Sequence, residues 1–187
     1  STTSNVERQR RVAFSPIIFV AGTKLMVRRD SGVQSYRDLA GKTVVVTEGT
    51  TNEAVIRALN ERNHLGARVI TGRDHGESYA MVADGRADAF ATDDVLLYGL
   101  IAQQRAADRL MVVGEFLSYE PYGIMFRRDD PAMAEAVDRA FATMARERDL
   151  IEYYHRWFER RTPNGETLGL PMSAQLAEVF RTLGVED

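Results

Sequence analysis

The sequence contains no cysteine among its 187 residues. Disulfide bonds and thiolate metal sites are therefore excluded, whereas the redox compartment of the protein stays open. The sequence also lacks any apolar run that approaches the roughly 18–20 residues of a membrane-spanning helix. No signal-peptide pattern follows Ser1, so we expect the chain to be a mature, processed or cut piece of a longer product.

Several motifs of enzyme active sites are missing as well. The sequence has no GxSxG nucleophile turn and no GxxxxGK[ST] phosphate loop, and its three histidines show no HExxH-type spacing. We therefore expect no zinc site, no bound cofactor and no catalytic set that spacing alone would assemble.

The sequence also lacks a large excess of positive or negative charge, since it contains 24 basic and 27 acidic residues and its net charge is −3. This balance excludes a general attraction to nucleic acid or to an anionic membrane. The basic segment WFERR (157–161) has acidic neighbours and is interpreted as a solvated helix end. An anionic ligand must therefore be bound by a local site.

Strand-like and helix-like segments alternate along the middle of the chain. The stretch TVVVTEGTTNEAVIRALNE (43–61) runs from a β-prone segment through a small polar turn into a helix. This order predicts parallel βαβ units and an α/β fold class. Further strands are expected at 67–70, 87–94 and 110–115, and helices at 35–42, 78–85 and 95–104.

Two apolar segments, at 17–27 and 110–128, bracket this α/β block. Gly22 in the first of them marks a bend or a close backbone approach. We interpret both segments as crossings between two lobes. The expected division is one complete parallel-sheet lobe over 20–116, inserted into a second lobe formed by 1–19 and 117–187.

The two ends of the chain are expected to be largely helical. SNVERQRR (4–11) is typical of a capped, charged helix with Asn5 or Ser4 as N-cap. Alternatively, Arg8 in this segment could grip a carboxylate with its two parallel donors, as a lysine could not. Towards the carboxyl end we expect a helix over 132–158, a loop over 162–171 and a helix over 173–184 capped by Ser173.

The turn TEGTT (47–51) is a candidate binding site, because ligands of open α/β sheets lie outside the carboxyl ends of the strands. Free N–H groups and the helix dipole favour an anion there, and the hydroxyls of Thr50 and Thr51 can donate as well. The alternative is that one threonine only caps its own helix, with Glu53 completing a capping box.

Two further turns bring polar side chains to the same edge. RDHGES (73–78) contains His75, whose imidazole could donate to an acid group, or could simply be solvated. FATDD (90–94) ends in two carboxylates, and Asp93 could pair with an ammonium group. The alternative is that both acids offset the dipole of the next helix, which we favour for Asp94.

Six stretches, in order and spread over nearly the whole chain, resemble a known family: STTSNVERQRRVAFS, FVAGTKLMVRR, DLAGKTVVVTEGTTNEA, RDHGES, GRADAFATDDVLL and PYGIMFRRDDP. With them the chain resembles the periplasmic solute-binding proteins of polar amino-acid ABC transporters, most closely the glutamate/aspartate-binding members. The resemblance implies a type II periplasmic-binding-protein fold. In that fold two lobes close by a hinge around one amino acid and present it to a membrane permease.

The resemblance also implies which residues contact the ligand. In the first lobe, Arg8 matches the arginine that holds the α-carboxylate, and Ser1 and Thr3 match hydroxyl or main-chain contacts. In the complete lobe the matches are Thr51 for a carboxylate at the helix end, His75 for the acidic side chain and Asp93 for the α-ammonium group, with Thr50 and Asn52 as neighbours.

The sequence departs from the family pattern at its beginning. In the family, the first of these motifs is preceded by a substantial part of the first lobe, with further arginines for the ligand's side chain. The resemblance therefore implies an incomplete first lobe that lacks part of the binding site. We expect this lobe to expose apolar surface and strand edges, which favour self-association or strand exchange between copies.

The expected function is the binding of L-glutamate or L-aspartate for delivery to an ABC permease, in the periplasm, without catalysis and without nucleic acid. Three alternatives remain open: an enzyme resembling cyclohexadienyl dehydratases with Glu48 or His75 as general acid, an effector-sensing domain, or a fragment that binds nothing. The preference between the two amino acids is not predicted, because one methylene is worth only about 1–3 kcal/mol.

Overall fold

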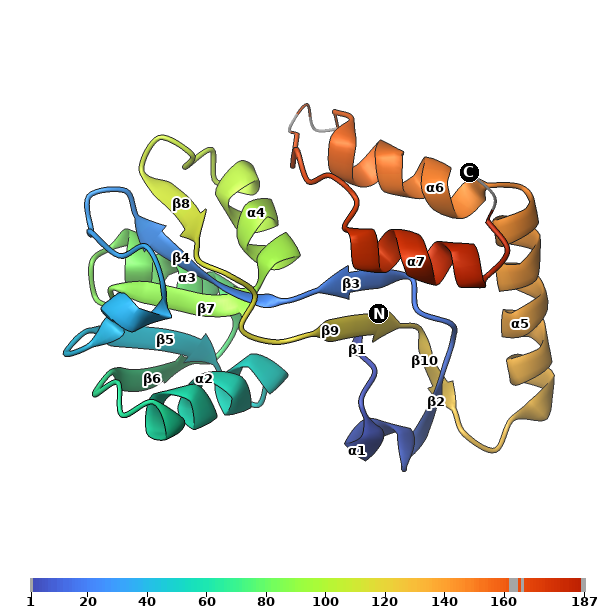
Figure 1. Cartoon of the computed structure of the whole chain (residues 1–187), viewed down its shortest axis with the longest axis horizontal. Helices are drawn as coiled ribbons and strands as arrows, with labels where there is room; N and C mark the ends of the chain where they lie inside the picture. The colour runs from blue at the N-terminus through green and yellow to red at the C-terminus, as the bar shows by residue number, and fades with distance from the viewer. Residues whose placement is uncertain (1, 162–164, 166, 186–187) are drawn as a thin grey trace. The chain divides into compact units, whose positions relative to one another are not determined.

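A computed structural model describes residues 2–161, 165 and 167–185 (Figure 1). The chain forms two compact units: unit 1 comprises Ser1–Ala21 and Glu120–Asp187, and unit 2 comprises Gly22–Tyr119. The chain therefore passes between the units twice, after Ala21 and after Tyr119. Part of the loop expected over 162–171 lies outside the described residues.

Unit 2 is built on a five-stranded sheet with the order β6-β5-β7-β4-β8 (Figure 1). β5 runs parallel to β6 and β7, whereas β4 runs antiparallel to β7 and β8. The predicted parallel units are therefore correct for β5 to β8, and β4 is the one reversed strand. The strands are β4 (Thr23–Arg28), β5 (Thr43–Thr47), β6 (Arg68–Gly72), β7 (Ala89–Asp93) and β8 (Leu110–Val113).

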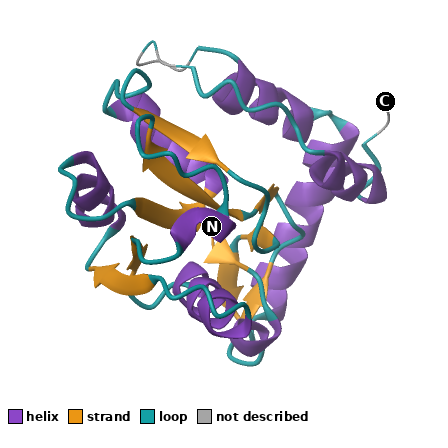
Figure 2. Ribbon diagram, turned by 60° about the vertical axis from the view of Figure 1, so that its left-hand side comes forward, coloured by secondary structure: helices purple, strands orange, loops and turns teal. Residues whose placement is uncertain are grey.

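Side chains alternate between two apolar cores, one on each face of this sheet, and helices cover both faces (Figure 2). Val44 and Val46 pack in the first core with Ile56, while Val45 between them packs in the second with Phe90. The sequence of a strand that is buried on both faces is a continuous apolar run, which explains the pattern TVVVT. The helices are α2 (Thr51–Arg62), α3 (His75–Ala83) and α4 (Asp94–Gln103), with a short 3-10 helix over Tyr36–Leu39.

Three details of unit 2 differ from the sequence-based expectation. The helix expected over 35–42 is only the single 3-10 turn, because Gly41 adopts a left-handed conformation with φ +69°. α3 begins at His75 rather than at Ser78, since the side chain of Asp74 accepts a hydrogen bond from the amide of Glu77 and caps the helix earlier. The crossing over 17–27 is two strands, interrupted at Gly22.

Gly22 marks a close backbone approach, as expected. A Cβ atom at this position would lie 2.4 Å from the ring of Phe116 and 2.7 Å from the carbonyl oxygen of Ser118. The two segments through which the chain enters and leaves unit 2 therefore lie against each other, and only glycine fits between them.

The described residues of unit 1 form short strands and five helical segments (Figure 1). The single helix expected over 132–158 is broken at Arg148, whose φ of +63° is left-handed, and its last turn is a π-helix. The expected caps Asn5 and Ser173 are confirmed, because their side chains accept from Arg8 N and Leu176 N. The strands are β1 (Thr2–Thr3), β2 (Val12–Phe14), β3 (Phe19–Ala21), β9 (Glu120–Gly123) and β10 (Met125–Arg127), and the helices are α1 (Val6–Gln9), α5 (Pro131–Arg146), α6 (Asp149–Tyr154), the π-helix (His155–Glu159) and α7 (Ala174–Thr182).

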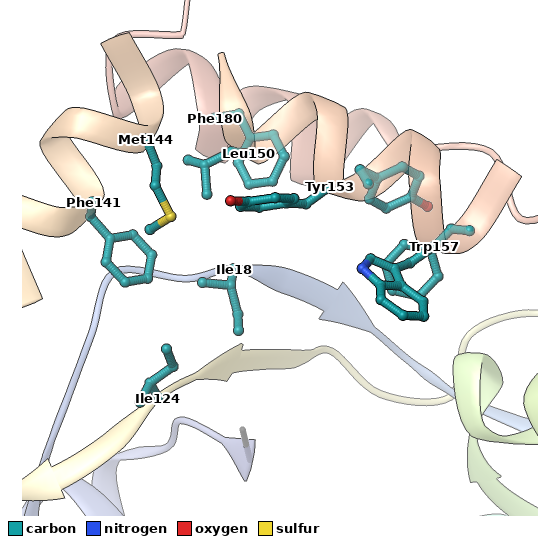
Figure 3. A pocket seen from close by; sticks show the side chains of 10 residues that line it. Ile18, Ile124, Phe141, Met144, Leu150, Tyr153, Trp157 and Phe180 are labelled. Atoms are coloured by element: carbon teal, nitrogen blue, oxygen red, sulfur yellow. The ribbon is translucent and has the colours of Figure 1, made fainter. Parts of the chain in front are cut away.

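An apolar hollow of about 280 Å³ lies between the helices and strands of unit 1 (Figure 3). Three of its lining side chains are large and exposed: Ile124 to 46%, Tyr153 to 44% and Trp157 to 49%. Unit 1 thus has the exposed apolar surface that we expected, and self-association through it stays a prediction. The other lining residues are Ile18, Phe141, Met144, Leu150, Tyr154, Phe158 and Phe180.

Within the described ranges, no helix combines the length and the apolar character needed to cross a membrane.

Two glycine substitutions in unit 2 should change stability in opposite directions. A Cβ at Gly72 would lie 2.4 Å from Ser78 Oγ, so Gly72→Ala should lower the free energy of unfolding by about 1–3 kcal/mol. Gly99 lies within α4, and no described atom comes within 4 Å of the position that a Cβ would occupy there. Gly99→Ala should therefore raise the free energy of unfolding by about 0.5–1 kcal/mol. Urea unfolding followed by circular dichroism measures both changes. Equal effects of the two substitutions would contradict the close packing at Gly72.

Candidate functional site

The carboxyl ends of β5, β6 and β7 form one edge of the sheet in unit 2, since these strands are parallel. At this edge β5 ends in Thr47 and is followed by α2, β6 is followed by α3, and β7 ends in Asp93 and is followed by α4. The structure therefore brings the candidate residues of unit 2 to one edge, with the amino ends of three helices beside them.

The turn after β5 caps α2 with its own side chains. Thr50 Oγ1 donates to Thr47 O at 2.7 Å and accepts from Glu53 N at 3.2 Å. Glu53 Oε2 accepts from Gly49 N at 2.9 Å, and this amide, with the guanidinium of Arg57, holds the pKa of the Glu53 carboxyl below its usual value. The hydroxyl of Thr50 is thus used within the turn. Thr51, the first residue of α2, has a half-buried side chain.

Asp93 lies at the same edge and is only 5% exposed. Its Oδ1 accepts from Asn52 Nδ2 at 2.7 Å, and the same Asn52 nitrogen donates to Thr23 Oγ1 at 2.7 Å. Asn52 is itself 3% exposed, so its side chain points into unit 2. This position, the second of a helix, gave no sign in the sequence that its amide would hold a carboxylate.

The network continues from Asn52 to the chain segments at the border of unit 2. Thr92 Oγ1 donates to Asn52 Oδ1 at 3.4 Å, and Thr23 Oγ1 lies 2.7 Å from Ser118 Oγ. Thr23 pairs with Asp93 across β4 and β7, which explains why Asn52 reaches both. The Asp93 carboxylate is therefore fixed in position by neutral groups that are themselves buried.

Asp94 has a different role from Asp93. Its carboxylate Oδ1 accepts from Gly22 N at 3.3 Å, and its own amide donates to Gly22 O at 3.0 Å. Burial raises the pKa of the Asp94 carboxyl, although the Gly22 and Val95 amides and Lys24 act in the opposite direction. Asp94 thus holds the first crossing segment onto α4.

His75 takes part in a chain of buried hydroxyl groups. Its Nδ1 lies 2.7 Å from Thr47 Oγ1, which lies 3.1 Å from Ser78 Oγ. Ser78 Oγ in turn donates to Asp74 O at 2.9 Å. The imidazole ring is half-buried, with its centroid 6.2 Å from that of Phe90. Sequence reasoning found His75 but missed Thr47, which holds the ring.

The other candidates belong to unit 1. Arg8 lies in α1, and its Nη1 donates to Thr2 Oγ1 and to Thr3 O, both at 2.9 Å. Thr3 is 6% exposed. These contacts hold the guanidinium against β1. Ser1, the remaining candidate, lies outside the described residues.

The edge in unit 2 offers complementary groups for a charged small molecule. The amino end of α2 favours an anion, the Asp93 carboxylate favours a cation, and the His75 imidazole can donate or accept a hydrogen bond. Within the described part of the chain, no group of three or more His, Asp or Glu side chains is arranged to hold a metal ion. The groups named above offer hydrogen bonds and ion pairs to a ligand.

The chain is similar in sequence to known solute-binding proteins. An L-glutamate/L-aspartate-binding protein of Pseudomonas aeruginosa is 40% identical over 181 residues, which cover 96% of this chain and 60% of that protein. A glutamate/aspartate import solute-binding protein of Salmonella typhimurium is 38% identical over 183 residues, which cover 98% of this chain and 60% of that protein. The chain thus spans about 60% of the length of both relatives.

The fold and the family are also supported by a structure and a family model. The GluR0 ligand-binding core from Nostoc punctiforme, in complex with L-glutamate, gives a TM-score of 0.70 at 27% identity, covering 85% of this chain and 71% of that one. The expected α/β fold of the type II periplasmic binding proteins is thereby confirmed. The family model described as "ABC transporter, phosphonate, periplasmic substrate-binding protein" matches residues 21–162. The chain therefore belongs to the family of periplasmic substrate-binding proteins of ABC transporters.

Proposed function

We propose that the chain binds an acidic amino acid, L-glutamate or L-aspartate, for delivery to an ABC permease. The observation that carries this proposal is the buried carboxylate of Asp93, held by Asn52 at the edge where α2 begins. A carboxylate at this edge attracts the ammonium group of a ligand, and the neighbouring helix end favours an anion. A zwitterion satisfies both requirements at once.

Names of relatives and the description of the family point to different ligands. The two relatives at 38–40% identity are named for glutamate and aspartate, whereas the family model is described by phosphonate. An alkylphosphonate without an amino group would bring negative charge next to the Asp93 carboxylate, and this repulsion disfavours it. The amino acid is therefore the better match to the groups of unit 2.

The proposed roles follow the resemblance. Asp93 receives the α-ammonium group, Thr51 and the amino end of α2 hold a carboxylate, and His75 contacts the acidic side chain. The hydroxyl of Thr50 is occupied by capping, and the amide of Asn52 by Asp93, so both act by positioning their neighbours. From unit 1, Arg8 holds the α-carboxylate with contributions from Thr3 and Ser1.

We further propose that the protein acts in the periplasm, without catalysis. A dehydratase resembling the cyclohexadienyl enzymes would need a positioned general acid, and Glu48 and His75 are the candidates that the turns offer. Incubation with prephenate or arogenate tests this alternative, because turnover of either would overturn the non-catalytic proposal. An effector-sensing role and a fragment that binds nothing are the remaining outcomes.

Replacement of Asp93 should weaken binding strongly. Removing one partner of a buried charge pair costs about 2–5 kcal/mol, so Asp93→Asn should raise the Kd for L-glutamate by at least about 30-fold. Calorimetric titration of the purified chain measures this change. The matched control is Asp84→Asn, an exposed acid at the end of α3, which should leave the Kd unchanged. Equal affinities of the two variants would contradict the proposed role of Asp93, and no heat in the unmodified chain would indicate a non-binding fragment.

The ligand class should depend on the amino group. L-glutamate and L-aspartate should both give saturable heats, whereas methylphosphonate, which has no ammonium group to pair with Asp93, should give none at the same concentrations. Competition between L-glutamate and methylphosphonate in the same titration provides the control. Displacement of L-glutamate by methylphosphonate would instead favour the ligand in the family description.

A further inference from the structure

The hydroxyl chain beside His75 has only one consistent direction of hydrogen bonding. Asp74 O is a carbonyl oxygen and can only accept, so the hydrogen between it and Ser78 Oγ, at 2.9 Å, belongs to Ser78. Ser78 has no second hydroxyl hydrogen, so the one between Ser78 and Thr47, at 3.1 Å, belongs to Thr47. Thr47 can then only accept from His75 Nδ1, at 2.7 Å.

The opposite direction is disfavoured by burial. If Ser78 donated to Thr47 and Thr47 to His75, two oxygen atoms would face each other at 2.9 Å without a hydrogen between them. Ser78 is fully buried and Thr47 is 7% exposed, so water cannot relieve this repulsion.

This direction fixes the tautomer of the neutral imidazole. Nδ1 bears the hydrogen that Thr47 accepts, so Nε2 of a neutral His75 has a lone pair and can only accept. Within the described part of the chain, Nε2 makes no hydrogen bond, and in the proposed function it is the atom that contacts the ligand. Nε2 gains a hydrogen to donate only when the imidazole becomes protonated.

We propose that His75 selects the ligand's side chain by its protonation state: it binds a carboxylate when protonated and an amide N–H when neutral. This inference rests on the proposed amino-acid-binding function and names the residue that sets its acid-to-amide specificity. A carboxylate only accepts, so its binding to Nε2 requires the uptake of one proton. An amide group can donate to the neutral ring without any proton uptake.

Few charges surround the imidazole. On its own helix, Glu77 is paired with Arg73 at 3.1 Å, and Asp74 Oδ1 accepts from Glu77 N at 2.8 Å. From the other elements packed against the ring, β5 is followed by exposed Glu48, and β7 contributes the uncharged ring of Phe90. Among the described residues, none of these charged side chains makes a hydrogen bond or an ion pair with the imidazole.

The proposal predicts opposite pH dependences for two ligands of similar shape. At pH values at which His75 of the ligand-free protein is neutral, binding of L-glutamate takes up one proton. The affinity for L-glutamate should therefore fall by up to about tenfold for each unit of rising pH. Binding of L-glutamine takes up none, so its affinity should stay constant or rise. The ratio of the two affinities should therefore fall as pH rises from 6 to about 8.5.

Calorimetric titrations at pH 8 in two buffers with different heats of ionisation measure the proton uptake directly. We expect uptake of close to one proton per bound L-glutamate, and almost none for L-glutamine. His75→Gln supplies a hydrogen-bond donor that does not titrate. This variant should therefore bind L-glutamate without proton uptake and should keep its affinity for L-glutamate. Thr47→Val is nearly isosteric and frees Nδ1 from its acceptor, so the neutral ring can carry its hydrogen on Nε2 and the pH dependence should flatten.

The tautomer is observable without any ligand. Nitrogen-15 spectra of the ligand-free chain at pH 8 distinguish the two ring nitrogens, and comparison with His75→Gln identifies the signals of His75 among the three histidines. A hydrogen on Nδ1 is expected, and a hydrogen on Nε2 would overturn the inference. Binding of L-glutamate without proton uptake would overturn the inference alone, whereas no heat with either amino acid would overturn the proposed function together with it.

Discussion

The antiparallel pairing of β4 with β7 is the interaction on which the rest of unit 2 depends. It places Thr23 opposite Asp93, at the border through which the chain enters the unit. Only in this register can the one amide nitrogen of Asn52 bond both residues at 2.7 Å. The same strand pairs with the edge strand β8, so the segments entering and leaving the unit lie side by side in one sheet.

Keeping two adjacent buried carboxylates charged costs free energy, because both are desolvated and they repel each other. The two carboxylates have different roles in the structure. Asp94 is used within the protein, where it bonds the amide of Gly22, and burial raises the pKa of its carboxyl. Asp93 is held instead by the neutral amide of Asn52. Asn52 brings no charge of its own to this contact, which positions the carboxylate at the edge of the sheet.

Local patterns in the sequence predicted most elements of unit 2 and the caps of both terminal segments, because strands, turns and N-caps are determined by neighbouring residues. The reversal of β4 depends on contacts between distant segments, and the break at Arg148 on a single backbone conformation. The early start of α3 depends on a local cap by Asp74 that the sequence analysis missed. Local sequence patterns likewise do not reveal the long-range contacts of the site. Its candidates followed from turn positions and resemblance, whereas the supporting contacts of Asn52 and Thr47 join residues 41 and 28 positions apart.

Both charged groups offered by this edge are positioned by side chains that do not titrate in the ordinary pH range. An amide holds Asp93, and hydroxyls anchored on a backbone carbonyl hold His75. A charged partner on His75 Nδ1 would have favoured one protonation state of the ring. Neutral support fixes the geometry and the direction of the hydrogen bonds while leaving the charge free to respond to a ligand. This is the property that a site needs if it is to distinguish a carboxylate from an amide of the same shape, because the two differ only in charge and in what they can donate.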